Sequence, residues 1–557
     1  MIHRDNEAQG KTNRRVAMFN GKRLSGWMAL AVFATVGGAM VATDPAFAKT
    51  DVDKLTISGE IRERYEIRTN ASLIGSGSQG VKGNESVASH RVRVGIGYDL
   101  TPDVSFFAQI SDARYFGSEG TAAGSGAAAA STQNANSNGI DLHQGYIQLK
   151  NVLVPGLSLK AGRQEIIFGD HRLFGNFGWS QIGNAFDGAR LTHSTQSANV
   201  DLFWARIVDP TAVAAGAAGQ PAILFPGNSG SAAAAQASNT QDIYGAYVTL
   251  KPVKNWTIEP YVFMLQDHRS IGTAQAGATT IITAQAQGQS RNFLGGRVNG
   301  KQGGLDFTYE GNYQFGSIAS QCTRLQTAAA CGQAGPAGSG MGQGQDARIN
   351  AHQHAVKTGY TFDAVPMKPR LGFEFNYASG DKCANGNGGA VNNVNGCDDG
   401  RRHFNTADNL YPTNHFHMGY MDLMSWKNMV NYHIMFDVKP SPVSKLQFNY
   451  IIHRLANTAD NWYRAGQVAY ATSRVTNQEA SLGQELDVHY WHTFKEKFKF
   501  EIGFGHFFTG AYIDKTATSN NNFTQGASTL NGTAVQQGAV QTTADQNWGY
   551  VMGSILF

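Results

Sequence analysis

Arginine residues recur in segments where polar and apolar residues alternate, and their side chains are well suited to binding anions. A guanidinium group stays charged and binds a carboxylate through two parallel hydrogen bonds. A closed wall lined with such groups would concentrate an anion and pass it between equivalent sites. The arginines on or beside alternating segments are Arg62, Arg64, Arg91, Arg93, Arg114, Arg163, Arg172, Arg190 and Arg454.

Acidic residues occur in the same segments, so each arginine has two alternative roles. It can face an open path for anions, or it can pair with a neighbouring carboxylate and hold two strands together. The sequence leaves this choice open for each residue. The candidates for the path are Arg62, Arg64, Arg93, Arg114, Arg163, Arg172, Arg190, Arg454, Glu165, Asp187, Glu310 and Glu485.

Two other kinds of chemistry have weaker support in the sequence. The histidines that invite a metal hypothesis are His403, His415, His417 and His433. Hydrogen bonding within a loop explains their spacing better than metal binding, so we expect no metal and no cofactor. Ser111, Asp112 and His453 are scattered, and no nucleophile motif accompanies them. The sequence therefore does not predict an enzyme.

The four cysteines form two local pairs, Cys322 with Cys331 and Cys383 with Cys397. Each pair lies in a stretch rich in Gly, Ala and Asn. In an oxidising compartment such pairs predict two disulfides within loops. A zinc site is the alternative, but neither pair has the spacing of two cysteines separated by two residues.

Period-two alternation predicts the elements that must position the arginines. Residues 55–68, 91–98 and 305–315 place apolar side chains on one face and polar side chains on the other. A soluble sandwich would alternate in the same way. A barrel in a membrane is favoured because opposite charges cluster on the polar face. Arginine on the lipid face costs about 2–4 kcal/mol at mid-bilayer, so we expect nearly all arginines inside the barrel or in loops.

The connections between alternating segments switch regularly between short and long, which is typical of periplasmic turns and extracellular loops. Short turns are expected at 101–103, 155–156, 252–254 and 441–442, and long loops at 117–140, 209–240, 317–348, 380–426 and 511–546. About eighteen antiparallel strands are expected, a number wide enough for an aqueous path. Their predicted starts are near residues 54, 88, 104, 141, 156, 184, 198, 241, 256, 291, 304, 349, 368, 427, 445, 482, 498 and 547.

The two ends of the chain fit export to a Gram-negative outer membrane. Residues 1–48 read as a cleavable leader, with Lys22 and Arg23 before an apolar stretch and Ala46-Phe47-Ala48 at its end. Met18 is an alternative start. Residues 49–557 then form a single barrel, whose last strand alternates and ends at Phe557. Without the leader, 39 Lys and Arg face 38 Asp and Glu, a net charge of +1 that predicts no nucleic-acid partner.

Two blocks of sequence resemble the alginate-export porin family of the bacterial outer membrane. The first block comprises Gly162–Glu165 (GRQE), Gly169–Leu173 (GDHRL), Gly175-Asn176 with Trp179, and Phe186–Leu191 (FDGARL). The second comprises Leu410–His417, Gly419–Leu423, Trp426–Asn428, His453–Ala456 and Trp462-Tyr463. The resemblance extends over roughly residues 55–557, with the long loops unmatched.

The resemblance implies a channel that exports an acidic polysaccharide such as alginate through an arginine-lined constriction. Uptake of small organic anions is the alternative, and an outer-membrane enzyme or adhesin is a third class of function. The expected partners are the transported anion, outer-membrane lipid and periplasmic secretion proteins, and the barrel is expected to be monomeric. We expect the channel to favour chloride over potassium.

Overall fold

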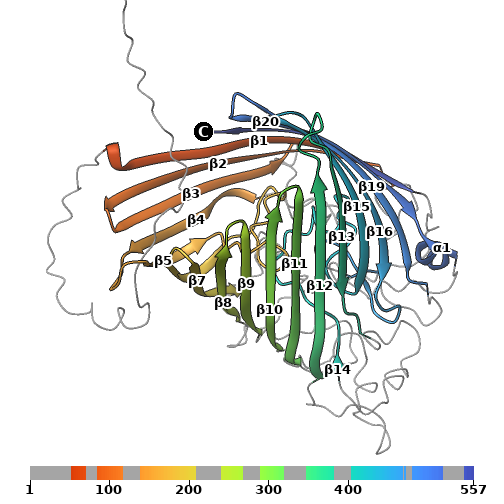
Figure 1. Cartoon of the computed structure of the whole chain (residues 1–557), viewed down its shortest axis with the longest axis horizontal. Helices are drawn as coiled ribbons and strands as arrows, with labels where there is room; N and C mark the ends of the chain where they lie inside the picture. The colour runs from red at the N-terminus through yellow and green to blue at the C-terminus, as the bar shows by residue number, and fades with distance from the viewer. Residues whose placement is uncertain are drawn as a thin grey trace, which may run out of the picture.

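In the computed structural model, one closed β-barrel accounts for most of the described chain (Figure 1). The structure describes residues 52–70, 84–116, 138–208, 240–267, 289–318, 347–381, 403–467, 469–471, 479–518 and 545–557. Nineteen strands of this part join in one sheet, of which β14 is two residues paired in parallel with β12. The other eighteen strands form the barrel wall, and each pairs antiparallel with its neighbours, as the alternation predicts.

The wall strands follow one another around the barrel in chain order (Figure 1). The first nine are β1 (Leu55–Thr69), β2 (Glu85–Thr101), β3 (Val104–Tyr115), β4 (Asn138–Lys150), β5 (Leu157–Gln164), β6 (Phe186–Ser194), β7 (Ala198–Val208), β8 (Gln241–Val253) and β9 (Trp256–Asp267). The other nine are β10 (Gln289–Gln302), β11 (Leu305–Ile318), β12 (Ala347–Thr361), β13 (Arg370–Ala378), β15 (Met429–Ser441), β16 (Ser444–Leu455), β19 (Ser481–Phe494), β20 (Phe498–Thr509) and β21 (Gln546–Leu556).

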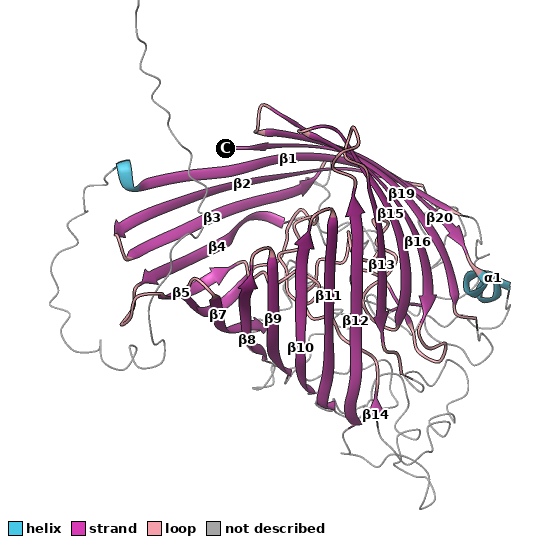
Figure 2. Cartoon of the chain, in the orientation of Figure 1, coloured by secondary structure: helices cyan, strands magenta, loops and turns pink. Residues whose placement is uncertain are grey.

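Five further elements lie outside this wall. They are the 3-10 helix η1 (Val52–Lys54), the strands β14 (His403–Phe404), β17 (Trp462–Tyr463) and β18 (Ala469–Ala471), and the helix α1 (Ala511–Thr518). Figure 2 shows how completely strand dominates the described part of the chain. Every predicted strand start lies within three residues of an observed wall strand.

Pairing between the first and last strands closes the barrel. Ile61 on β1 lies opposite Ile555 on β21, and the pairing runs from Glu60 to Thr69. Gly59 donates its N–H to the carbonyl of Phe557 (2.8 Å), and the Phe557 N–H returns to Gly59 O (3.1 Å). Closure satisfies the backbone groups that an open sheet edge would leave unpaired in lipid.

The two faces of the wall carry the expected residue types because successive side chains of a strand point to opposite sides. On β1, Ile57, Ile61 and Tyr65 are exposed on the outer face, whereas Arg62 and Arg64 point inward and are buried. No helix in the described part of the chain is long and apolar enough to span a membrane.

The two ends of the barrel differ in their connections. At one end, adjacent strands are joined by tight turns such as 102–103, 254–255 and 303–304. Asn255 (φ 66°) and Gly303 (φ 58°) adopt the left-handed backbone that such turns need. We call this the short-turn end. The opposite end, where the long connections begin, is the long-loop end.

Two connections from the long-loop end pack inside the barrel. We call residues 165–185, between β5 and β6, the first inner segment, and residues 405–428, before β15, the second inner segment. Phe174 and Tyr411 bridge the two segments, and their rings lie 5.3 Å apart. Both belong to a buried apolar cluster that includes inward residues of the wall, such as Phe203 and Phe263. The barrel therefore has a packed interior at this level.

Candidate functional site

Four inward arginines on β1 and β2 hold the first inner segment. Each is buried and donates a hydrogen bond to a backbone carbonyl of that segment. The bonds join Arg62 Nη1 to Gly178 O (2.8 Å), Arg64 Nη1 to Trp179 O (2.6 Å), Arg91 Nη1 to Ser180 O (2.9 Å) and Arg93 Nη2 to Ile182 O (2.5 Å). A hydrogen bond from a charged donor contributes about 1.5–3 kcal/mol. These arginines thus fix the segment to the wall.

Three carboxylates balance this arginine cluster. The nitrogen–oxygen distances are Arg62–Glu60 3.0 Å, Arg91–Glu60 2.5 Å, Arg64–Glu66 2.8 Å and Arg93–Glu165 3.3 Å. Glu165 also accepts hydrogen bonds from His143 (2.8 Å) and Asn176 (3.0 Å). Burial alone would raise the pKa of Glu165, but the His143 hydrogen bond and the Arg93 charge lower it below its ordinary value. Glu165 therefore helps to anchor the first inner segment to the wall.

Trp179 joins the two inner segments at this anchor. The Arg64 guanidinium lies 4.1 Å from the centre of one of its rings. His415, from the second inner segment, stacks on Trp179 with ring centres 4.0 Å apart. His415 Nδ1 lies 3.0 Å from the Asp422 carboxylate. Cation–π contact and stacking thus connect β1 to both segments.

The tip of the first inner segment reaches the opposite wall. Arg172 is buried, and it donates to Glu374 Oε1 (2.5 Å) and Asn376 Oδ1 (2.9 Å) on β13. Asp170 accepts a hydrogen bond from Arg297 on β10 (2.5 Å). The segment is therefore fastened to β1 and β2 at one place and to β10 and β13 at another, so it crosses the interior.

Glu310 lies beside this crossing, on the inner face of β11. Its carboxylate is buried and accepts a hydrogen bond from the Tyr261 hydroxyl at 3.4 Å. Arg297 pairs with Glu259 (2.5 Å) in the same layer. Glu310 is inward, as expected, but it lies within the packed interior.

Glu485 fastens the second inner segment to β19. Its carboxylate accepts the backbone N–H of Met421 (2.9 Å) and lies 3.3 Å from His453 Nε2. Gly419 adopts φ 103°, and a Cβ there would lie 2.7 Å from both Glu485 carboxylate oxygens. Only glycine lets the backbone approach so closely. Glu485 is therefore an anchor within the interior.

Arg190 is the predicted arginine that both points inward and keeps access to solvent. Its side chain is 24% exposed, and Nε lies 2.8 Å from Asp201. Lys160 is its direct neighbour across the β5–β6 pair. Lys160 packs its ammonium 4.2 Å from the Tyr146 ring centre, and it has no carboxylate within 4.0 Å among the described residues. The pair forms a basic patch on one wall.

Besides Arg297 on β10, the inward basic residues missed from sequence include three near the short-turn end of the other wall. Lys357 lies 3.4 Å from Glu374, Lys445 lies 3.3 Å from Asp437, and Arg370 pairs with Asp306 at 2.6 Å. Their neighbours in sequence are outward apolar residues, such as Leu371 beside Arg370. The same alternation of polar and apolar residues that identified the other arginines therefore also indicates that these three residues point inward.

Arg163 and Asp187 correct the expected set, because they lie on the outer face. They form an ion pair at 3.1 Å, and the Asp187 side chain is 61% exposed. Asp187 lies opposite Arg206 of β7, which follows the outward residues Leu202 and Trp204 by alternation. Both expected pore residues therefore face away from the interior. The face was misassigned because polar residues occur on both faces of these strand ends.

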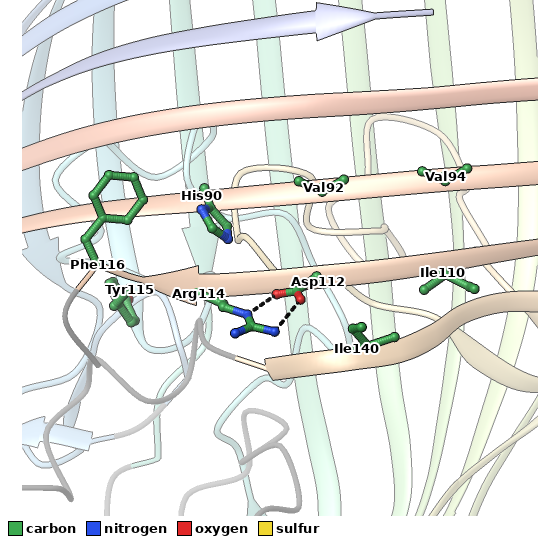
Figure 3. A pocket seen from close by; sticks show the side chains of 9 residues that line it. All are labelled: His90, Val92, Val94, Ile110, Asp112, Arg114, Tyr115, Phe116 and Ile140. Carbon is green, nitrogen blue, oxygen red and sulfur yellow. Dashed lines mark hydrogen bonds and ion pairs between the residues drawn. The ribbon is translucent and has the colours of Figure 1, made fainter. Parts of the chain in front are cut away.

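Arg114 and Arg454 are also corrected to the outer face. Arg114 lies on the same face of β3 as the exposed Phe106 and Ile110. It donates hydrogen bonds to both carboxylate oxygens of Asp112, at 2.6 and 2.7 Å (Figure 3). Arg454 is exposed on β16, and His453 beside it points inward. Both lie at the long-loop end, where a charged side chain on the outer face can reach water.

The histidines hold contacts within the protein. His417 Nε2 donates to the carbonyl of Asp170 at 2.5 Å, and burial together with the Arg172 charge holds the pKa of His417 well below its usual value. His433 is buried 3.5 Å from Asn376, and His403 lies in β14. Among the described residues, no group of three or more His, Cys, Asp or Glu could hold a metal ion. The two predicted disulfides lie outside the described residues.

Solved structures with a similar chain path include three bacterial proteins. OccAB1 of Acinetobacter baumannii is 13% identical over 93% of this chain and 99% of its own, with a TM-score of 0.48. OpdL of Pseudomonas aeruginosa is 10% identical over 91% of this chain and 99% of its own (TM-score 0.48). OccK8 (OprE) of the same organism is 11% identical over 91% and 98% (TM-score 0.47).

A protein-family model described as alginate export matches residues 53–527. No curated protein matches the chain. The matched range begins in η1 and ends beyond α1, so it contains every wall strand except β21. It also contains both inner segments.

Proposed function

Because this chain belongs to the alginate export family, we propose that it is an outer-membrane channel through which an acidic polysaccharide such as alginate leaves the cell. Membership of that family makes the chain a channel protein and not an enzyme. The observation that carries the proposal is the set of basic side chains on the inner wall near the short-turn end. These residues are Lys160, Arg190, Lys357, Arg370 and Lys445.

The wall strands are numerous enough to leave an aqueous path. Barrels of 16–18 strands generally enclose a channel. The inner segments occupy the long-loop side of this interior, whereas the five basic residues lie within a few residues of the short turns. A polymer entering from the short-turn end would therefore meet basic side chains before the constriction.

The basic residues lie on opposing walls. Strands β6 and β16 are nine strands apart in a wall of eighteen, so Arg190 and Lys445 face each other across the interior. Each carboxylate of a polyuronate chain can accept two hydrogen bonds from a guanidinium group or one from an ammonium group. Neighbouring sites such as Lys160 and Arg190 let an incoming carboxylate bind before the previous one leaves, as conduction requires.

The carboxylates beside these bases also belong to the proposal. Asp201, Glu374 and Asp437 each lie within 4.0 Å of a basic residue. They reduce the net positive charge and keep binding weak enough for release. Lys160 lacks such a partner among the described residues, so no neighbouring carboxylate neutralises its charge.

The test is block of single-channel current by uronate oligomers in planar bilayers. We expect Lys160→Gln with Arg190→Gln to weaken block about tenfold or more, because a lost charge-assisted contact costs about 1.5–3 kcal/mol. Arg163→Gln is the matched control, since it removes an arginine from the outer face of β5, the strand that carries Lys160. Equal block in the double variant, the control and the unchanged protein would refute the proposed path.

Uptake of small organic anions is the second candidate. The observation that favours it is the packed interior, because two inner segments leave less room than an empty barrel of this size. Oligomer length separates the two functions. A polymer channel binds longer uronates more tightly, since more carboxylates bind at once. A small-anion channel shows its strongest block with monomers or dimers.

We also infer that residues 1–48 are a leader removed during export and that the mature barrel lies in the outer membrane as a monomer. The alternation of short and long connections supports this orientation, with short turns toward the periplasm. Secretion proteins in the periplasm would then deliver the polymer to the short-turn end. Mass spectrometry of the protein from outer-membrane fractions tests the cleavage after Ala48.

A further inference from the structure

Two histidines lie next to each other on the outer face of β12. His352 and His354 are separated by one residue, so both side chains point to the same side of the strand. That side is the outer one, because Gln353 between them is buried and Tyr313, directly opposite His352 on β11, is exposed. Figure 1 shows β12 in the wall between β11 and β13. Neither residue is among the histidines considered from the sequence.

The facing nitrogens of the two rings are as far apart as two ligands of one metal ion. His352 Nδ1 lies 3.2 Å from His354 Nε2. An imidazole nitrogen binds a metal ion such as zinc at about 2.0–2.1 Å, so two of them on one ion are about 2.9–3.4 Å apart when their bonds enclose about 90–109°. The observed separation lies within this range. Imidazole is mostly neutral at neutral pH, and the neutral form is the one that binds metal.

Two tyrosines on the neighbouring strands hold the rings in this arrangement. The Tyr309 hydroxyl on β11 lies 3.0 Å from Nδ1, the other ring nitrogen of His354. Tyr377 on β13 stacks on His352, with ring centres 5.2 Å apart and 24° between the ring planes. A metal-binding histidine usually has its second nitrogen in such a hydrogen bond, which fixes the orientation and tautomer of the ring. When Tyr309 accepts the Nδ1–H of His354, the Nε2 lone pair is available for a metal ion.

Gly311 on β11 leaves room for the contact between Tyr309 and His354. It lies directly opposite His354 in the strand pair. A Cβ at Gly311 would lie 2.5 Å from the Tyr309 hydroxyl and 3.0 Å from His354 Nδ1. The φ of Gly311 lies outside the left-handed region, so this position needs glycine for space rather than for backbone conformation.

The two histidines lie at the boundary between the apolar band of the outer wall and its polar rim. A membrane-spanning strand needs about 9–11 residues, and β12 has 15. Counted from the short-turn end at Thr361, such a span ends at residues 351–353. Beyond it, the outer face of β12 carries the exposed Asn350 and Arg348. Arg348 is about 13 Å along the strand from His352, which exceeds the Debye length of about 8 Å. A cation in water at the long-loop end can therefore reach the histidines.

We propose that His352 and His354 together bind one first-row metal ion, such as Cu²⁺ or Zn²⁺, at the outer rim of the barrel. Imidazole nitrogen suits these ions, whereas Ca²⁺ and Mg²⁺ prefer oxygen ligands. Affinities of a given site for divalent ions are highest for Cu²⁺ in this series. Water takes the remaining positions on the ion, since no group of three or more His, Cys, Asp or Glu occurs in the described part of the chain.

The test uses the full-length barrel in detergent, purified without a polyhistidine tag and titrated with Cu²⁺ alone. We expect one bound Cu²⁺ per barrel, with the electron paramagnetic resonance signature of two imidazole nitrogens. His352→Gln and His354→Gln should each remove this signal. His193→Gln is the matched control and should keep it, because His193 lies on the outer face of β6 opposite Leu157 and Val200 and not beside a second histidine.

Two variants test the residues that position the rings. Tyr309→Phe keeps both metal ligands but removes the hydroxyl, and we expect it to weaken Cu²⁺ binding about tenfold or more. Gly311→Ala places a methyl group against the hydroxyl and His354 Nδ1, and we expect it to weaken binding for the same reason. Single-channel current, measured on the same samples, shows that each variant is folded.

Competition and location complete the experiment. Ca²⁺ or Mg²⁺ at millimolar concentration should not displace Cu²⁺. A two-nitrogen signal that survives both histidine substitutions would overturn the proposal. So would its absence from the unchanged protein, because the 3.2 Å contact would then be only a hydrogen bond between the rings. Block by uronate oligomers should be the same in all these variants, since the site lies outside the barrel, so the result is separate from the test of the transported substrate.

Discussion

Two arginines that look equivalent in the sequence differ in the structure, because one forms a buried ion pair and the other an exposed one. Arg172 and Arg163 belong to the same motif block, nine residues apart. Arg172 is buried against Glu374, whereas Arg163 and Asp187 are exposed on the outer face. Breaking a buried pair leaves an unpaired charge without water, but an exposed pair contributes little.

From this contrast we expect Arg172→Met to destabilise the barrel by about 3–5 kcal/mol and Arg163→Met to change stability by about 0–1 kcal/mol. Samples are heated to a series of temperatures and run on a gel without boiling. The measurement is the temperature at which half of the folded band is lost. The current of Arg172→Met should also become noisier, because the tip of the first inner segment loses its anchor. A fully stable, quiet Arg172→Met channel would contradict the assignment of Arg172 as an anchor.

His417 makes the stability of the folded barrel depend on pH. Its pKa is lowered in the folded protein, by burial first and then by the Arg172 charge, so the folded state favours the neutral imidazole. The stabilising contribution is complete above the unfolded pKa of about 6.5. It is lost as pH falls from there toward the folded pKa.

We therefore expect the thermal midpoint to fall between pH 7 and pH 5. His417→Gln, whose side-chain amide can still donate to Asp170 O, should show a smaller fall. His193→Gln, on the outer face of β6, is the matched control and should keep the full dependence. An identical pH profile in all three proteins would show that other groups cause the loss.

At the scale of elements, Gly419 lets the second inner segment approach β19. Its φ of 103° suits glycine, and an added Cβ would meet the Glu485 carboxylate at 2.7 Å. We expect Gly419→Ala to cost about 1–3 kcal/mol in backbone strain and to raise conductance, because the segment must move away from Glu485.

The control for this substitution is Gly178→Ala in the first inner segment. A Cβ at Gly178 would come no nearer than 3.7 Å to Asn176 Oδ1, which is an ordinary contact. Single-channel conductance and the thermal midpoint serve as the measurements for both variants. Equal effects of the two alanine substitutions would show that the close approach at Gly419 does not anchor the second inner segment.

The closing seam depends on another glycine. A Cβ on Gly59 would lie 2.3 Å from the Phe557 ring, which packs over that position. We expect Gly59→Ala to slow closure of the barrel and cost about 1–3 kcal/mol through overpacking. Gly549→Ala on β21, whose Cβ would lie 3.5 Å from its nearest neighbour, should have little effect. Refolding yield on an unheated gel compares the two.

At the scale of the whole molecule, charge and packing are arranged along the axis. The accessible basic residues lie toward the short-turn end, and the anchored inner segments lie toward the long-loop end. Residues 49–557 carry a net charge of +1, so selectivity must come from this placement. Uronate oligomers should therefore block more strongly from the short-turn side than from the long-loop side.

Planar bilayers with one inserted channel test this asymmetry directly, and reversal potentials in KCl gradients test the expected preference for chloride. Insertion direction is fixed by protease cleavage of a tag placed in a long loop. Symmetric block would contradict the axial arrangement of the basic residues. A preference for potassium would contradict the anion path itself.

The sequence by itself determined the strands of this protein. Period-two alternation depends on local geometry, so the eighteen starts and the face of Arg62 and Arg64 followed without any long-range contact. The family blocks likewise identified the family. They pointed to residues 162–191 and 410–428 as important, although they did not show where these segments lie.

Only the tertiary structure decided which arginines face inward at the strand ends and what they bind. Arg114, Arg163 and Arg454 lie at strand ends where both faces carry polar residues, and they point outward because a charged side chain at the long-loop end can reach water. The inward fold of the first inner segment depends on arginine hydrogen bonds to carbonyls of residues such as Gly178 and Trp179. Every residue has a backbone carbonyl, so these bonds leave no trace in the sequence.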